Sequence, residues 1–230
     1  MSADGGSPGP KDNQGNDVST YFNTDRPVDV LREELEERAQ SRPLQPGTAF
    51  EEQVANGVPC EWVITPPAEG VEPLPPTQVY FHCHGGGYYR GSSRVAGPIC
   101  SSVCAVAGFT RCLSVNYRTA PEHPFPAALD DTFAAYSWLI SPDGGGYRPS
   151  DVIVGGDSAG GGLIMGLLLR LRDEAPESLP AGGVPFSPWT DLTQSGETFV
   201  TNADTGVPNC DKDYLSAPHA QAPAGCFPAR

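Results

Sequence analysis

Residues 152–172 read VIVGGDSAGGGLIMGLLLRLR and place a strand signal, a tight turn and a helix signal in direct succession. The strand signal is the β-branched run Val152–Val154, and the helix signal is the leucine-rich run Ala159–Arg172. Between them lies GDSAG at residues 156–160, a G-x-S-x-G pentapeptide. This order predicts one β-α unit of a parallel sheet, with the turn at the carboxyl end of the strand.

The pentapeptide in this setting predicts a nucleophile elbow with Ser158 as the nucleophile. The turn is tight enough that bulky neighbours would clash, which accounts for Gly156 and Gly160 on either side. The Ser158 hydroxyl would lie at the C-terminal edge of the sheet, beside the positive end of the following helix. The alternative is a glycine-rich turn that binds a phosphate. No P-loop lysine follows, however, and the G-x-G-x-x-G spacing of a dinucleotide site is not clean.

A second motif, HGGG at residues 84–87, directly follows the strand-like run Gln78–Cys83. Acyl transfer builds negative charge on a carbonyl oxygen, and backbone N–H groups must point at that oxygen. Three glycines after a strand allow this because they place no Cβ atom in the way. The matching donor beside the nucleophile is the N–H of Ala159. The alternative is a flexible loop, but the two motifs together favour an oxyanion hole.

Strand-like and helical segments alternate along the rest of the chain. An amphipathic helix is expected to begin near Asp25–Pro27, and Asn56-Gly57 predicts a hairpin turn because both residues tolerate positive φ. The alternation predicts an α/β fold with a mostly parallel central sheet and helices on both faces. The expected strands are 50–55, 60–64, 78–83, 110–117, 152–154 and 183–186, and the further expected helices are 95–107, 126–140 and 159–172.

Composition divides the chain into three parts. Residues 1–20 are polar and rich in glycine and proline, so we expect them to be disordered. Residues 21–205 carry the α/β pattern and form the expected domain. Residues 206–230 are interrupted by prolines and predict an irregular tail.

Charge and hydropathy limit the classes of partner. The net charge of −14 argues against nucleic acid and against an anionic membrane surface. No apolar run approaches the roughly 20 residues of a membrane span, and the first residues lack a signal-peptide pattern. Seven cysteines without a CxxC pair favour buried thiols in a reducing cytosol, so a cytoplasmic location is expected.

Four segments together resemble the hormone-sensitive-lipase-like esterases of the α/β-hydrolase fold. They are FHCHGGGYYRGS at 81–92, NYRTAPEHPFPAA at 116–128, GGDSAGG at 155–161 and VPFSPWTD at 184–191. The resemblance implies that Ser158 attacks the ester and that Gly85, Gly86 and Ala159 supply the oxyanion hole. It also implies an N-terminal helical cap and a carboxylic ester hydrolase that works through a serine acyl-enzyme. The implied substrates are small-molecule esters with short- to medium-chain acyl groups, and no cofactor or metal is implied.

The same family places its catalytic Asp and His well downstream of the serine. Only 72 residues follow Ser158 (230 − 158), and His219 is the only histidine among them. We therefore expect the C-terminal strands that carry the acid and the base to be missing. His82, His84 and His123 are interpreted as structural. Two alternatives to an esterase remain: a non-catalytic small-molecule receptor, as in plant gibberellin receptors, and an inactive truncated fragment. Asp204, Asp211 and Asp213 are candidate acids by position alone.

Overall fold

The computed structural model describes residues 26–193 and 195–197, which belong to two compact units. The larger unit contains residues 32–190 and the whole sheet, and the smaller contains the described residues 26–31, 191–193 and 195–197. Helix α1 (Val28–Ser41) begins in the smaller unit and continues into the larger one. In the smaller unit, the Asp191 carboxylate accepts bonds from the amides and hydroxyls of Thr193 and Ser195, which lowers its pKa.

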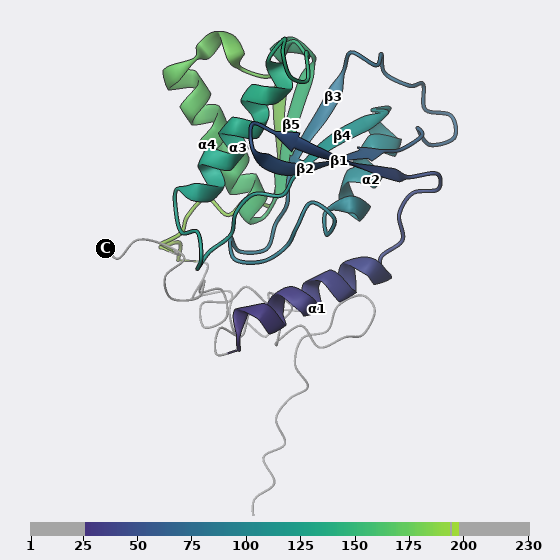
Figure 1. The fold of residues 1–230 in the computed structure, drawn as a ribbon. Coiled ribbons are helices and arrows are strands. Elements are labelled where there is room, and N and C mark those ends of the chain that lie inside the picture. The colour runs from purple at the N-terminus through teal and green to yellow at the C-terminus, as the bar shows by residue number, and fades with distance from the viewer. Residues whose placement is uncertain (1–25, 194, 198–230) are drawn as a thin grey trace, which may run out of the picture. The chain divides into compact units, whose positions relative to one another are not determined.

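Six strands form one mixed sheet in the larger unit (Figure 1). Their order across the sheet is β1-β2-β4-β3-β5-β6. The pairs β3–β4, β3–β5 and β5–β6 are parallel, whereas β1–β2 and β2–β4 are antiparallel. The strand bounds are β1 Ala49–Ala55, β2 Val58–Ile64, β3 Val79–Cys83, β4 Arg111–Val115, β5 Val152–Asp157 and β6 Gly182–Phe186.

The predicted elements are confirmed, with changes at their ends. Asn56 and Gly57 form the hairpin turn with φ values of 49° and 84°, as their tolerance of positive φ predicts. Strand β5 runs three residues beyond the predicted Val154, since its backbone keeps pairing with β3 through Gly156 and with β6 through Asp157. The strand expected at 110–117 is shorter, spanning Arg111–Val115.

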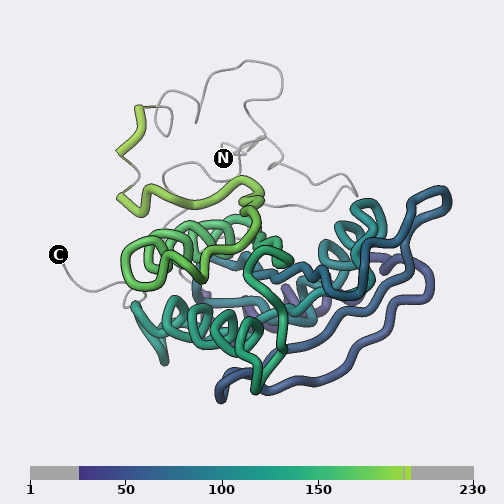
Figure 2. Tube along the Cα trace, turned by 90° about the horizontal axis from the view of Figure 1, so that it is seen from above, coloured from purple at the N-terminus to yellow at the C-terminus, as the bar shows by residue number. Residues whose placement is uncertain are grey.

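Helices cover both faces of the sheet, as predicted. Helices α3 (Ala127–Ile140) and α4 (Ala159–Glu174) lie side by side on one face (Figures 1 and 2), where residues such as Phe81 and Val154 form the larger core cluster. Helix α2 (Gly97–Ala107) covers the other face, over a core that includes Tyr80, Phe109 and Cys112. Two 3₁₀ turns, Pro149–Asp151 and Pro176–Ser178, flank β5 and α4.

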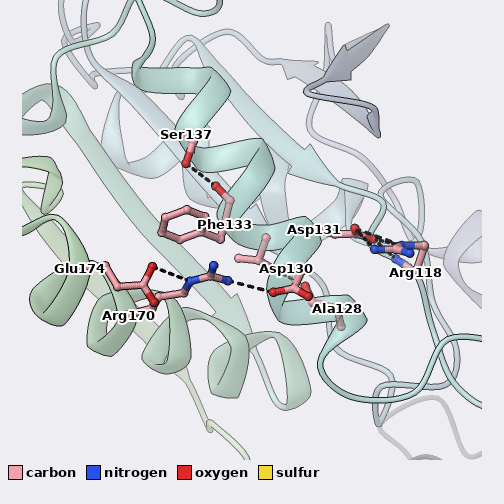
Figure 3. Close-up of polar contacts among 9 residues, drawn as sticks. Arg118, Ala128, Asp130, Asp131, Phe133, Ser137, Arg170 and Glu174 are labelled. Carbon is pink, nitrogen blue, oxygen red and sulfur yellow. Dashed lines mark hydrogen bonds and ion pairs between the residues drawn. The ribbon is translucent and has the colours of Figure 1, made fainter.

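Charged side chains bind α3 to its surroundings (Figure 3). The Arg170 guanidinium on α4 donates to Asp130 on α3 at 2.9 Å and to Glu174 at 3.1 Å, and lies 4.0 Å from the centre of the Phe133 ring. On the other side of α3, the buried Asp131 accepts bonds from the backbone and guanidinium of Arg118. The loop that follows β4 is therefore tied to α3.

The five cysteines within the described residues are buried free thiols, as expected: Cys60, Cys83, Cys100, Cys104 and Cys112. Cys210, Cys226, the predicted disordered start and the predicted irregular tail lie outside the described residues, so the boundaries at 20 and 205 stay predictions. In the part of the chain that the structure describes, no helix combines the length and apolarity needed to cross a membrane.

Candidate active site

Ser158 lies at the turn between β5 and α4, which confirms the predicted strand–turn–helix. Its backbone has φ 53° and ψ −117°, a conformation that a residue with a Cβ rarely adopts. Neighbouring backbone holds it there: the Ser158 N–H donates to Phe186 O at 3.0 Å, and the Trp189 N–H donates to Ser158 O at 2.9 Å. The strained turn is therefore fixed from the β6 side, and Ser158 is partly exposed.

The two glycines of the pentapeptide are required by close backbone contact. A Cβ on Gly160 would collide with the carbonyl oxygen of Cys83, and one on Gly156 would lie 2.5 Å from the Gly160 carbonyl. No real Cβ atom comes this near to backbone. The end of β3 thus passes directly against the first turn of α4, and this contact brings the glycine loop after β3 close to the elbow.

The glycine loop begins at His84, which is buried and anchors the loop rather than reacting. Its ring stacks on Tyr117 with centroids 4.1 Å apart. The His84 Nδ1 donates to the Gly85 carbonyl at 2.7 Å, and the Tyr117 hydroxyl donates to the His84 carbonyl at 2.7 Å. Burial lowers the pKa of His84 to about 4, so the ring is neutral at pH 7. This agrees with the structural role expected for it.

The carbonyl groups of the loop are bonded so that two N–H groups stay available. A trans peptide directs its C=O and its N–H to opposite sides. The Gly85 carbonyl accepts from His84, and the Gly86 carbonyl accepts from the Tyr89 and Arg90 amides at 3.3 and 3.2 Å. The N–H groups at the opposite ends of these peptides, on Gly86 and Gly87, have no acceptor among the described residues.

Gly85 was expected to donate to the oxyanion, and its geometry argues against this. Its N–H donates to Asp157 Oδ1 at 3.0 Å. A Cβ on Gly85 would also collide with the other oxygen of that carboxylate. The Gly85 N–H is thus directed at the residue before the nucleophile, because β3 and β5 are neighbouring parallel strands. Gly86 and Ala159 keep available N–H groups, the latter as the first residue of α4 with no intrahelical acceptor.

Asp157 is the partly exposed end of a polar row that the sequence does not predict. His82 Nε2 lies 3.3 Å from Asp157 Oδ1, and His82 Nδ1 lies 3.0 Å from the Tyr80 hydroxyl. Burial lowers the pKa of His82, whereas Cys100 and the bond to Asp157 raise it, and the net direction is upward. Burial raises the pKa of Asp157, but His82 and the Gly85 N–H outweigh it, so this carboxyl is held ionised. The place of His82 in the strand-like run 78–83 was the only signal, and it predicted a structural role alone.

Two aromatic residues border the elbow. The rings of Tyr88 and Trp189 lie 5.9 Å apart. A Cβ on Gly162, in the first turn of α4, would collide with the Tyr88 hydroxyl and lie 2.6 Å from the Trp189 carbonyl. Burial raises the pKa of Tyr88 to about 12, so its hydroxyl stays protonated. An apolar wall therefore stands next to Ser158.

Arg32, on helix α1, contacts two loops of the larger unit. Its guanidinium donates to the carbonyls of Tyr89 and Ala120, both at 2.8 Å, and forms two bonds to Glu122 at 2.9 and 2.7 Å. This pairing lowers the pKa of Glu122 to about 2. Arg32 thus joins α1 to the glycine loop and to the loop after β4. Only the charged face of the predicted helix pointed to Arg32, and no motif predicts these contacts.

No described histidine hydrogen-bonds to the Ser158 side chain. His82 and His84 are fully buried behind the elbow, and His123 lies on the exposed surface of the loop after β4. His219 and the candidate acids Asp204, Asp211 and Asp213 lie outside the described residues. Within the described ranges, no group of three or more His, Cys, Asp or Glu could hold a metal ion.

Three features define an α/β hydrolase: the parallel pair of β3 and β5, the serine at the turn after β5, and the glycine loop after β3. Residues 79–217 match the family described as alpha/beta hydrolase fold, which is more than half of the chain. An esterase from the bacterial hormone-sensitive lipase family has a solved structure with 41% identity and a TM-score of 0.68, covering 86% of this chain and 65% of that one. The chain belongs to the hormone-sensitive-lipase-like part of the alpha/beta hydrolase fold family.

Curated relatives carry matching descriptions. An esterase of Acinetobacter venetianus is 36% identical over 126 residues, which is 55% of this chain and 40% of that protein. An acetyl-hydrolase of Streptomyces hygroscopicus is 40% identical over 142 residues, which is 62% of this chain and 44% of that protein. The chain thus spans less than half the length of these two relatives.

Proposed function

We propose that this chain provides the nucleophile and the oxyanion donors of a carboxylic ester hydrolase that works through an acyl-enzyme on Ser158. One observation supports this most: a strained, partly exposed serine lies beside a loop with two consecutive N–H groups that lack acceptors among the described residues. A phosphate-binding turn, the other interpretation of the motif, would not need a serine held at positive φ. The family membership and the names of the relatives agree with ester hydrolysis.

The proposed chemistry follows from these positions. The Ser158 hydroxyl adds to the ester carbonyl, its proton passes to a general base, and the carbonyl oxygen becomes an oxyanion. We assign the donors to that oxyanion as the N–H groups of Gly86, Gly87 and Ala159. Gly87 replaces the expected Gly85, whose N–H is donated to Asp157. The base is a histidine outside the described residues, and the described part of the chain assigns it no position.

The proposed substrates are small-molecule esters with short- to medium-chain acyl groups. The wall formed by Tyr88 and Trp189 favours an apolar acyl or alcohol group next to Ser158. The solved structures include EstE5 soaked by p-nitrophenyl butyrate, at 32% identity and a TM-score of 0.68. We also propose that α1 is part of a cap beside the site, since Arg32 bonds to the glycine loop.

Covalent labelling with a fluorophosphonate, followed by peptide mass spectrometry, tests the assignment. We expect phosphonylation of Ser158, at a rate that depends on the base, and no label in the Ser158→Ala variant. Ser187 provides the matched control, because it is another serine at positive φ (43°) that precedes no helix. Label on another serine, or equal label in Ser158→Ala, would remove Ser158 from the mechanism.

Turnover of p-nitrophenyl butyrate separates an esterase from a receptor on the same fold. An esterase releases p-nitrophenol continuously, whereas a receptor binds the ester and releases none. Ligand binding without turnover or label would favour the receptor.

We also propose a cytoplasmic location, and the five buried free thiols support it. Fractionation of the cells that make the protein tests it, and recovery outside the cytoplasm would contradict it.

A further inference from the structure

A row of polar side chains, buried at Tyr80 and His82 and partly exposed at Asp157, lies behind the elbow and has no part in the proposed chemistry. Tyr80 and His82 come from β3, and Asp157 ends β5. The contacts run from the Tyr80 hydroxyl to His82 Nδ1 (3.0 Å), from His82 Nε2 to Asp157 Oδ1 (3.3 Å), and from that oxygen to the Gly85 N–H (3.0 Å). The row therefore ends on the backbone of the glycine loop.

An ionised carboxylate at the position of Asp157 costs free energy, which suggests that it has a specific role. Asp157 directly precedes the proposed nucleophile, and a negative charge there opposes an oxyanion on the substrate. Partial burial adds to this cost, because the carboxylate loses part of its contact with water although 37% of the side chain stays exposed. The structure offsets both costs with His82, which is fully buried and places Nε2 on the carboxylate. A fully buried histidine and a partly exposed carboxylate thus both serve one backbone amide.

That amide controls the direction of the loop. The peptide between His84 and Gly85 is bonded at both ends, by the Tyr117 hydroxyl at its carbonyl and by Asp157 at its N–H. With this peptide fixed, the Gly85 carbonyl meets His84 Nδ1, and the next N–H groups point to the opposite side. Without Asp157, the partly buried Gly85 N–H would be free to turn toward another acceptor, and the peptides after it would turn with it.

We propose that Asp157, held by His82, is a positioning residue that binds the Gly85 N–H and so directs the N–H groups of Gly86 and Gly87 at the substrate oxygen. This inference rests on the proposed ester hydrolysis for its consequence, but not for its geometry. Asp157 acts through the loop and does not touch the substrate. The hydrogen bond, rather than the negative charge, is what the loop needs.

Amide hydrogen exchange in the resting protein tests the geometry without any turnover. In the full ¹⁵N-labelled chain, we expect Asp157→Ala to speed exchange of the Gly85 amide by about tenfold or more, since a bond to a charged acceptor is lost. Asp157→Asn keeps a side-chain oxygen and should stay within about threefold of the parent. His82→Ala should speed exchange in the same direction by a smaller factor. Asp173→Ala, a surface aspartate paired with Arg172, is the matched control and should change nothing.

Kinetics then test the consequence. Loss of one oxyanion donor commonly lowers kcat by about 10²–10³, so we expect Asp157→Ala to lower kcat for p-nitrophenyl butyrate by about 10² with KM nearly unchanged, and Asp157→Asn to restore most of it. Where Asp157→Ala does not fold, Asp157→Ser serves as the deletion, because its shorter side chain cannot reach the amide. The fluorophosphonate rate at Ser158 is the single-turnover version of the same comparison.

The exchange and the kinetic experiments together separate the positioning role of Asp157 from the proposed ester hydrolysis. Unchanged Gly85 exchange in both deletion variants would overturn the inference, and so would an Asp157→Asn variant as impaired as Asp157→Ala. A parent protein that neither labels nor turns over would defeat the proposed esterase instead. Even then, the exchange arm alone supports or overturns the positioning of Gly85 by Asp157. No effect of His82→Ala would remove His82 from the inference.

Discussion

Ser158 is held in a backbone conformation that costs free energy and that its neighbours maintain. A non-glycine residue in a sparsely populated φ/ψ region costs about 1–3 kcal/mol. Three backbone bonds keep it there: the Ser158 N–H donates to the Phe186 carbonyl, and the Ser158 carbonyl accepts from the N–H groups of Gly162 and Trp189. The strain lifts the hydroxyl out of the turn, where a ligand can reach it. Stability and reactivity are therefore opposed at this one residue.

The Ser158→Gly variant tests whether stability and reactivity are opposed at this residue. Glycine adopts φ 53° without the Cβ penalty, so we expect the free energy of unfolding to rise by about 1 kcal/mol while fluorophosphonate labelling disappears. Denaturant unfolding measures the change. Ser141→Gly is the control, because Ser141 has an ordinary φ of −72° and glycine there should lower stability. A Ser158→Gly protein less stable than the parent would mean that the turn stores no strain.

His84 predicts how stability depends on pH. Its folded-state pKa is about 4 and its ordinary value is 6.5, so the unfolded chain binds a proton in the window between them and the folded chain does not. Protonation then favours unfolding, and stability falls as the pH drops through this window. The loss is about 3 kcal/mol at most, at about 1.4 kcal/mol for each unit of pKa difference.

Denaturant unfolding at several pH values, on the parent and on His84→Asn, checks this. The variant should lose less stability than the parent between pH 6.5 and pH 4, whatever its stability at pH 7. The lowered pKa values of Asp157 and Glu122 also weaken the fold in acid, but both proteins share them. Parallel curves for the two proteins would show that His84 titrates normally in the folded state.

At the level of elements, Arg32 joins helix α1 to two loops that are distant in the sequence. We expect Arg32→Lys to lower the free energy of unfolding by about 1–3 kcal/mol, because one ammonium cannot replace a planar group that bonds to Tyr89, Ala120 and Glu122 together. Labelling of Ser158 should slow as the glycine loop loosens. Thermal unfolding and labelling rates measure both effects.

Arg148→Lys is the matched control for this variant. Arg148 forms an exposed pair with Asp151 three residues away, and exposed pairs contribute about 0–1 kcal/mol. The Arg148→Lys variant should therefore leave the free energy of unfolding and the rate of Ser158 labelling nearly unchanged. An Arg32→Lys protein as stable and as reactive as Arg148→Lys would show that the bonds to Arg32 do not hold the loops.

Elements with a local signal could be predicted from the sequence, whereas the contacts between them could not. The hairpin at Asn56-Gly57 and the β5–α4 turn depend on neighbouring residues, so both were found. The bond from Gly85 to Asp157 joins residues 72 positions apart (157 − 85) and depends on the register of β3 against β5. No periodicity in the chain encodes that register, so the sequence alone does not predict that the Gly85 N–H meets Asp157.

For the larger unit as a whole, the alternation of strands and helices predicted the parallel part of the sheet but not the place of the hairpin. Strand β2 pairs with β4 rather than with β3, its successor in the chain. The β3-α2-β4 crossover places β4 between β2 and β3. The alternating pattern is the same for either order, so the sequence alone could not choose.

The strand order also predicts the order in which the strand pairs form during folding. The β1–β2 pair closes across two residues, whereas Val79 of β3 meets Val152 of β5 only after 73 further residues (152 − 79). Closing a long loop costs more entropy than closing a short one, so local pairs form early and distant pairs form late. We expect pulse-labelled hydrogen exchange during refolding to show the hairpin amides protected before those of β5. Protection of β5 first would contradict this order. A nascent chain would then fold most of its framework before Ser158 acquires the geometry that makes it reactive.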